Sequence, residues 1–99
     1  MTPQITIDPD RIEALCRRRG IRSLALFGSV LRPDFRSDSD VDVLVEYEPE
    51  RSIGFDIFEI EAELSRLLGG HPVDLVNRKY LNRRLRDRIL SEQEVIYER

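Results

Sequence analysis

Residues 28–45 read GSVLRPDFRSDSDVDVLV, and this stretch carries the strongest signal in the chain. The pair Gly28-Ser29 ends one apolar run, and the pair Asp40 and Asp42 opens a second apolar run. Side chains alternate between the two faces of a strand, so residues i and i+2 point the same way. Asp40 and Asp42 are therefore expected side by side, on one face, at the start of a strand.

Two carboxylates at this spacing indicate a cation and the phosphates that accompany it. Their charges repel each other unless a cation lies between them. Mg²⁺ is usually bound by one or two carboxylates together with substrate phosphates. Glycine lets the backbone approach a ligand closely, and a helical turn that begins at Ser29 would direct its free N–H groups at an anion. The stretch predicts a nucleoside triphosphate site in which Gly28 and Ser29 contact phosphates and Asp40 and Asp42 hold metal.

The spacing Gly-Ser, ten residues, Asp-x-Asp resembles the signature of the DNA polymerase beta-like nucleotidyltransferases. The neighbouring Arg32, Asp34 and Ser39 resemble the smallest branch of that family, the minimal nucleotidyltransferases, and the resemblance covers nearly the whole chain. It implies an α/β (α+β) fold, with a mixed sheet of roughly four strands flanked by helices. It also implies two Mg²⁺ ions held by three carboxylates, and transfer of AMP from ATP to an acceptor hydroxyl.

The resemblance also implies a partner. Many minimal nucleotidyltransferases are antitoxins that attach AMP to a tyrosine of a HEPN-domain toxin, so a HEPN-type toxin is the expected partner and ATP the expected substrate. One alternative is a non-catalytic antitoxin that neutralises its partner by docking alone. Another is a subunit that nucleotidylates a small molecule such as an aminoglycoside, which is disfavoured because such enzymes usually carry an additional substrate domain.

Asp74 is the candidate for the third carboxylate, because it interrupts the otherwise apolar residues 73–76. A buried, unpaired carboxylate is costly, so a partner or an edge position must compensate for it. The alternative is an aspartate that faces water at a strand end. In the resembled family this position belongs to a metal ligand or to the base that accepts the proton of the acceptor hydroxyl.

Arg32 follows Ser29 by three residues and is within reach of the same phosphates. The alternative is a surface arginine paired with Asp34 or Asp38. The family commonly has small or basic residues and then Arg-Gly after its Gly-Ser pair, whereas this chain has the more apolar Val-Leu-Arg-Pro of residues 30–33.

Size and composition exclude several classes of protein. With 99 residues, the chain is predicted to be a single domain, residues 1–99. No apolar run approaches the roughly 18 residues of a membrane span, and no signal peptide is recognisable. The single cysteine fits a reducing cytoplasm, and the net charge of −3 argues against a general nucleic-acid binder. A cytoplasmic protein without direct membrane or nucleic-acid binding is expected.

The remaining pattern predicts strands that alternate with helices. The predicted helices run from Asp8-Pro9 to Gly20, over 57–68 and around 81–89; the predicted strands cover 23–27, 40–47, 72–77 and 95–97; and a turn is expected at 49–54. Acidic residues gather in 46–63 and basic residues in 78–88. Both segments are expected as solvated faces, and the basic one alternatively as a partner-docking or triphosphate-steering surface. His71, which precedes Pro72, is expected in a surface turn.

Overall fold

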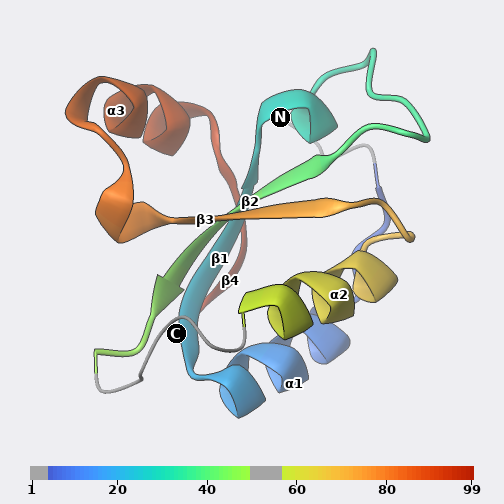
Figure 1. The fold of residues 1–99 in the computed structure, drawn as a ribbon, viewed down its shortest axis with the longest axis vertical. Helices are drawn as coiled ribbons and strands as arrows, with labels where there is room; N and C mark the ends of the chain where they lie inside the picture. The colour runs from blue at the N-terminus through green and yellow to red at the C-terminus, as the bar shows by residue number, and fades with distance from the viewer. Residues whose placement is uncertain (1–4, 50–56) are drawn as a thin grey trace.

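The computed structural model describes residues 5–49 and 57–99, and its helices and strands alternate along the chain (Figure 1). The elements are α1 (Pro9–Arg19), β1 (Ile21–Phe27), the 3-10 helix η1 (Gly28–Leu31), β2 (Val41–Tyr47), α2 (Ile57–Leu67), β3 (Val73–Asn77), the 3-10 helix η2 (Arg78–Tyr80), α3 (Arg83–Glu92) and β4 (Glu94–Glu98). The predicted mixed fold with four strands is confirmed. The turn expected at 49–54 lies largely outside the described residues.

The first helix begins and ends at its predicted caps. The Asp8 side chain accepts a hydrogen bond of 3.1 Å from the backbone N–H of Asp10, and Gly20 closes the helix in the left-handed conformation with φ 69°. The helix predicted around 81–89 is found as α3, which begins at Arg83, so Leu81 precedes it. Asn82 caps it by accepting a hydrogen bond of 2.9 Å from the N–H of Leu85.

The four strands form one sheet in the order β3-β2-β1-β4. β1 runs antiparallel to both β2 and β4, whereas β2 and β3 are parallel. β3 is therefore an edge strand, and no further strand among residues 5–49 and 57–99 satisfies its outer backbone groups. One of these groups is protected by α2, because the Glu61 carboxylate accepts a hydrogen bond of 3.0 Å from the N–H of Leu75.

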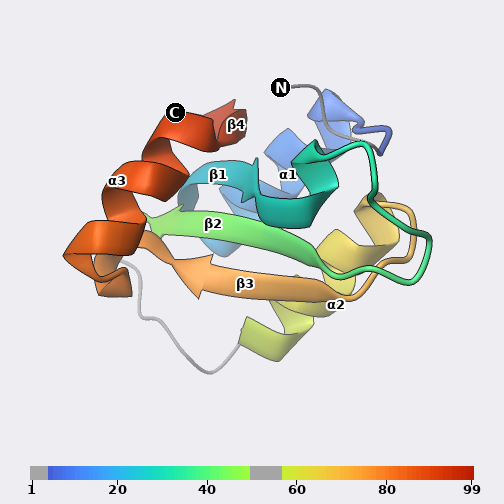
Figure 2. The ribbon, with the colours of Figure 1, turned by 90° about the horizontal axis from the view of Figure 1, so that it is seen from above.

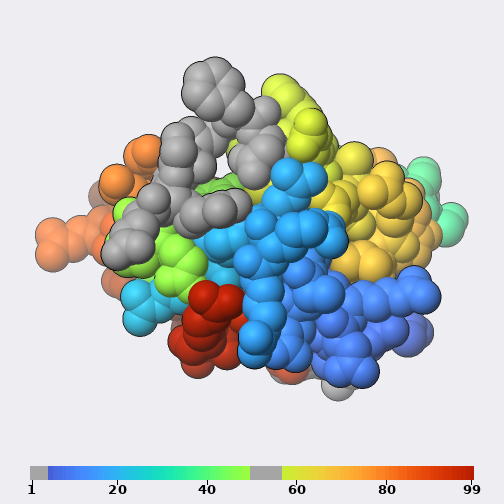
Figure 3. All heavy atoms as spheres, turned by 90° about the horizontal axis from the view of Figure 1, so that it is seen from below, coloured from blue at the N-terminus to red at the C-terminus, as the bar shows by residue number. Residues whose placement is uncertain are grey.

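The two faces of the sheet differ in what covers them. In Figure 1, α1 and α2 lie on one side of the strands, and η1 and α3 lie on the other. Figure 3 shows the helix-covered side, where α1 and α2 lie next to each other and the end of β4 lies beside α1. The core lies on this side and contains fully buried side chains from both helices and from the central strands: Ile12, Leu15, Cys16, Leu24, Leu26, Val41, Val43, Val45, Ile60 and Leu64.

The opposite side of the sheet is called the open face here. By strand alternation, Asp42, Leu44 and Glu46 of β2 point to it. Figure 2 views it from above, with α3 near the end of β2 and η1 near its beginning. No residue of α3 is buried, and Leu85 remains 48% exposed, so this helix packs only loosely. No helix in the described part of the chain is both long and apolar enough to cross a bilayer.

Candidate active site

The strand register brings two of the predicted carboxylates side by side. Asp42 of β2 pairs with Phe27 at the end of β1 on one side and with Asp74 of β3 on the other. Paired residues on neighbouring strands share a face and lie about 5 Å apart. Asp74 is exposed because β3 is an edge strand, and this position removes the desolvation cost expected for a buried carboxylate.

Asp42 lies in an environment that disfavours its negative charge. Partial burial raises the pKa of the Asp42 carboxyl above its ordinary value, and the negative charges of Asp74 and Asp40 raise this pKa further. Among the described residues, none of these three carboxylates has a basic side chain within ion-pair distance. The cluster lacks a compensating positive charge.

Asp40 lies just outside the strand, since β2 begins at Val41 and not at the predicted residue 40. The loop that carries it is held from two sides. The Ser29 hydroxyl donates a 3.5 Å hydrogen bond to the Asp40 carbonyl, and Nδ1 of His71 lies 3.1 Å from the Ser39 carbonyl, which can only accept. His71 also packs on Phe35, with ring centroids 4.8 Å apart. The prediction that His71 is a simple surface-turn residue was wrong, because it is half-buried and braces this loop.

Gly28 meets Asp42 where β1 turns into η1. Its φ of +76° lies in the left-handed region that glycine tolerates best. A Cβ atom at this position would collide with the Asp42 carboxylate. The glycine therefore serves two purposes, because it makes the turn and leaves room for the central carboxylate.

Three comparisons with known proteins bear on this geometry. The family described as "Polymerase beta, Nucleotidyltransferase" matches residues 10–99. The chain belongs to the polymerase beta nucleotidyltransferase family. It is 39% identical over 83 residues to the protein adenylyltransferase MntA of Thermococcus cleftensis, covering 84% of this chain and 80% of that protein.

Solved structures with the same fold include toxin–antitoxin complexes. One, a toxin–antitoxin with AMP-PNP, matches with a TM-score of 0.72 and 19% identity over 94% of this chain and 75% of that one. Another contains a tri-AMPylated HEPN toxin of Shewanella oneidensis in complex with an MNT antitoxin, and matches with a TM-score of 0.63 and 18% identity over 92% of this chain and 70% of that one. At these identities the likeness shows the fold.

Within this nucleotidyltransferase fold, Arg32 lies next to the Gly28 turn. Both line a cleft of 240 Å³ whose other wall is α3, with Arg88 and Glu92 among its residues. The structure thus places Arg32 beside Gly28, and its contact with phosphates stays a prediction. Arg88 was missed as an individual residue, and its only sequence signal was its membership of the basic segment 78–88.

The carboxylates of Asp40, Asp42 and Asp74 are suitable ligands for a cation, but they do not form a complete metal site in this structure. Aspartate oxygens are the hard ligands that Mg²⁺ prefers. The pKa of Asp42 is raised first by burial and then by the negative charges of Asp74 and Asp40, and a cation would neutralise that charge. In residues 5–49 and 57–99, however, no three His, Cys, Asp or Glu side chains converge as metal ligands. The residues that would hold a cation here are Asp40, Asp42 and Asp74.

Proposed function

We propose that this chain is a magnesium-dependent protein adenylyltransferase, which transfers AMP from ATP to a hydroxyl, expected on a tyrosine, of a HEPN-type toxin and thereby acts as its antitoxin. The observation that carries the proposal is the register that pairs Asp42 with Asp74 beside the Gly28 turn. The family and the 39% identity to a protein adenylyltransferase support the reaction class. The proposal places the reaction in the cytoplasm, where ATP is available.

The proposed roles of the site residues are phosphate binding at the Gly28 turn and metal binding at the three aspartates. Gly28 and Ser29 would bind phosphate through the backbone N–H groups of their turn and the Ser29 hydroxyl, and Arg32, which lines the same cleft as Gly28, would add a positive charge. Asp40, Asp42 and Asp74 are the residues that would hold Mg²⁺. When bound, Mg²⁺ neutralises charge on the phosphates and lowers the pKa of the attacking hydroxyl.

The reaction is a displacement at the α-phosphorus of ATP. A bond forms between the acceptor oxygen and the α-phosphorus, the bond to the oxygen that bridges to the β-phosphorus breaks, and pyrophosphate leaves with that electron pair. The proton of the acceptor hydroxyl passes to the Asp74 carboxylate. Its exposed position on the edge strand lets an acceptor approach it from solvent.

The test uses ATP labelled at the α-phosphate, Mg²⁺, and the protein encoded beside this one. We expect label on that partner with the wild-type chain and none with Asp40→Ala or Asp42→Asn. Asp38→Asn is the matched control, because it removes the same charge from an exposed residue of the same loop and should retain transfer. If Asp42→Asn still neutralises a toxic partner, the antitoxin acts by docking and the proposed mechanism of neutralisation is wrong.

A further inference from the structure

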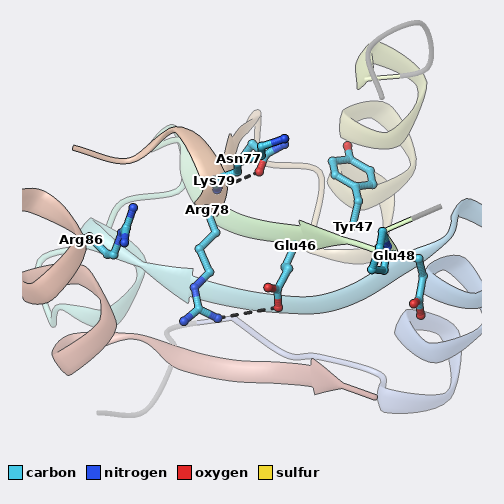
Figure 4. A pocket seen from close by; sticks show the side chains of 8 residues that line it. Glu46, Tyr47, Glu48, Asn77, Arg78, Lys79 and Arg86 are labelled. Atoms are coloured by element: carbon cyan, nitrogen blue, oxygen red, sulfur yellow. Dashed lines mark hydrogen bonds and ion pairs between the residues drawn. The ribbon is translucent and has the colours of Figure 1, made fainter. Parts of the chain in front are cut away.

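A cleft lies at the other end of β2 and β3, away from the three carboxylates. It has a volume of 460 Å³, within the ~300–1,000 Å³ that is usual for binding sites. Figure 4 shows that its walls come from the ends of both strands, from the residues that follow β3, and from α3. The charged residues that line it are Glu46, Glu48, Arg78, Lys79 and Arg86.

The charges of this cleft do not balance. Glu46 pairs with Arg78 at 3.7 Å, and Glu48 pairs with Arg99 of the chain's C-terminal end at 2.7 Å. Both acidic residues are thereby neutralised. Lys79 and Arg86 are exposed, and within the described ranges neither has an acidic side chain at ion-pair distance. Two positive charges remain for a ligand.

The position of the cleft identifies which substrate it faces. Glu46 and Asp42 point to the same face of β2 and are four residues apart, which corresponds to about 13 Å along a strand. Between them lies the buried side chain of Leu44. Gly28 adjoins Asp42 at the opposite end of the open face, where phosphates are expected. Lys79 and Arg86 line the cleft at the other end, so they are available to contact the acceptor instead of the phosphates.

We propose that this cleft binds an acidic segment of the acceptor polypeptide, about 13 Å from the hydroxyl that is modified. The inference rests on the proposed function insofar as it assumes a protein acceptor. An extended polypeptide spans this distance with about four residues. An acidic side chain at that separation would meet Lys79 and Arg86 while the acceptor hydroxyl lies at the carboxylates.

Binding is tested first without ATP, by fluorescence anisotropy with the full chain. The probe is a labelled synthetic peptide in which a tyrosine is flanked, about four residues away on each side, by glutamates. An otherwise identical peptide carries glutamines. Exposed ion pairs are individually weak, so we expect the acidic peptide to bind about tenfold more tightly at low salt, and the preference to fade as salt is added.

Two double variants with equal changes in charge locate the site. Lys79→Glu/Arg86→Glu should abolish the preference for the acidic peptide. Arg11→Glu/Arg66→Glu should keep it, because these arginines lie together between α1 and α2 on the helix-covered side. Equal binding of both peptides, absence of binding, or equal loss in both double variants would overturn the proposal. Thermal melting curves of all variants check that each is folded.

The transfer assay separates this inference from the proposed function. With the natural partner as acceptor, Lys79→Glu/Arg86→Glu should raise the KM for the partner about tenfold and leave the KM for ATP unchanged. An unchanged KM for the partner would refute the cleft as an acceptor site while AMP transfer itself stands. Absence of label with the wild-type chain would refute the proposed function, and the peptide measurement would still decide what the cleft binds.

Discussion

Glu63 and Asp42 are two partly buried carboxylates on opposite sides of the same sheet, and their surroundings shift their pKa values in opposite directions. On the helix-covered side, partial burial alone would raise the pKa of Glu63, but hydrogen bonds and charges from Arg19 and Arg18 outweigh it and hold the pKa below its ordinary value. On the open face, burial raises the pKa of Asp42, and its charged neighbours Asp74 and Asp40 add to the rise.

The difference separates a carboxylate that stabilises the fold from one that awaits a ligand. The Glu63 carboxylate of α2 accepts a hydrogen bond of 2.8 Å from Nε of Arg19 and also forms an ion pair with Arg18, so it links α2 to α1. Asp42 has no basic partner among the described residues, so its negative charge is compensated only when a cation binds. The fold can thus lose Glu63 at a cost in stability, whereas losing Asp42 should cost activity.

The largest effect is expected for Asp42→Asn on AMP transfer. Removing a carboxylate that holds metal should lower kcat/KM on the order of 1,000-fold, since the charge stabilisation from such a site is worth several kcal/mol. The rate is measured with α-labelled ATP and the partner protein. Glu63→Gln serves as the comparison and should keep a nearly normal rate. A comparable loss in both variants would break the division between the two carboxylates.

A second prediction concerns the glycine that crowds Asp42. Gly28→Ala and Gly70→Ala place alanine at similar backbone angles, φ +76° and +83°, and each should cost about 1–2 kcal/mol in unfolding free energy. Only at Gly28 would the new Cβ displace the Asp42 carboxylate, because nothing lies within 4 Å of a Cβ at Gly70. Such a displacement should lower transfer on the order of 100-fold.

Chemical denaturation and the transfer assay on both variants test this pair. Equal activity of Gly28→Ala and Gly70→Ala would mean that Asp42 can move aside without consequence. The close approach of the glycine to the carboxylate would then have no role in the reaction.

The third prediction addresses the stabilising carboxylate. Glu63→Gln should lower the free energy of unfolding by about 1–2 kcal/mol at pH 7, because Glu63 is only 16% exposed and has two arginine partners. Glu13→Gln is the matched control, since it removes a solvent-exposed pair with Arg17 and should cost only about 0.3 kcal/mol.

The pH dependence of this loss has a definite sign. A carboxylate with a lowered pKa in the folded state contributes stability above its ordinary pKa, about 4.3 for glutamate, and loses it as the pH falls through the folded value. The difference between wild type and Glu63→Gln should therefore shrink in acid. A difference that stays constant from pH 7 to pH 3 would show that the ion pairs are not its source.

The sequence predicted those parts of the site that depend on short-range pattern. Gly28, Asp40 and Asp42 were singled out by a turn signal and strand alternation within one segment. The structure places Gly28 beside Asp42, whereas Asp40 lies just outside β2, and the roles of all three stay predictions. The pairing of Asp42 with Asp74 depends on the register of two parallel strands joined through α2, and no local pattern sets that register.

Contacts between distant segments were not predictable from pattern. His71 lies 32 residues from Ser39, yet it braces the loop in front of Asp40. Likewise, α3 was predicted from its periodic apolar residues, but its loose packing follows from how few neighbours those residues meet on the open face. The basic charge of 78–88 was evident, whereas the position of Arg86 in one cleft and Arg88 in another needed three dimensions.

The smallest expected effect is the contribution of Asp42 to the free energy of unfolding. Because its pKa is raised in the folded state, ionised Asp42 destabilises the fold, and the contribution of Asp42 to stability should fall as the pH rises from the ordinary aspartate pKa, about 3.9, through the raised value. Asp42→Asn removes this penalty, so it should be more stable than wild type at pH 7, by less than about 1 kcal/mol given its partial exposure.

Mg²⁺ provides the complementary measurement, because a cation that binds only the folded site raises the free energy of unfolding. Thermal melts at pH 7 should show a higher Tm for wild type and for the loop control Asp38→Asn when Mg²⁺ is added, and little change for Asp42→Asn. If Asp42→Asn is instead less stable than wild type without Mg²⁺, then Asp42 is satisfied within the fold as Glu63 is, and the open face has no unmet demand for a cation.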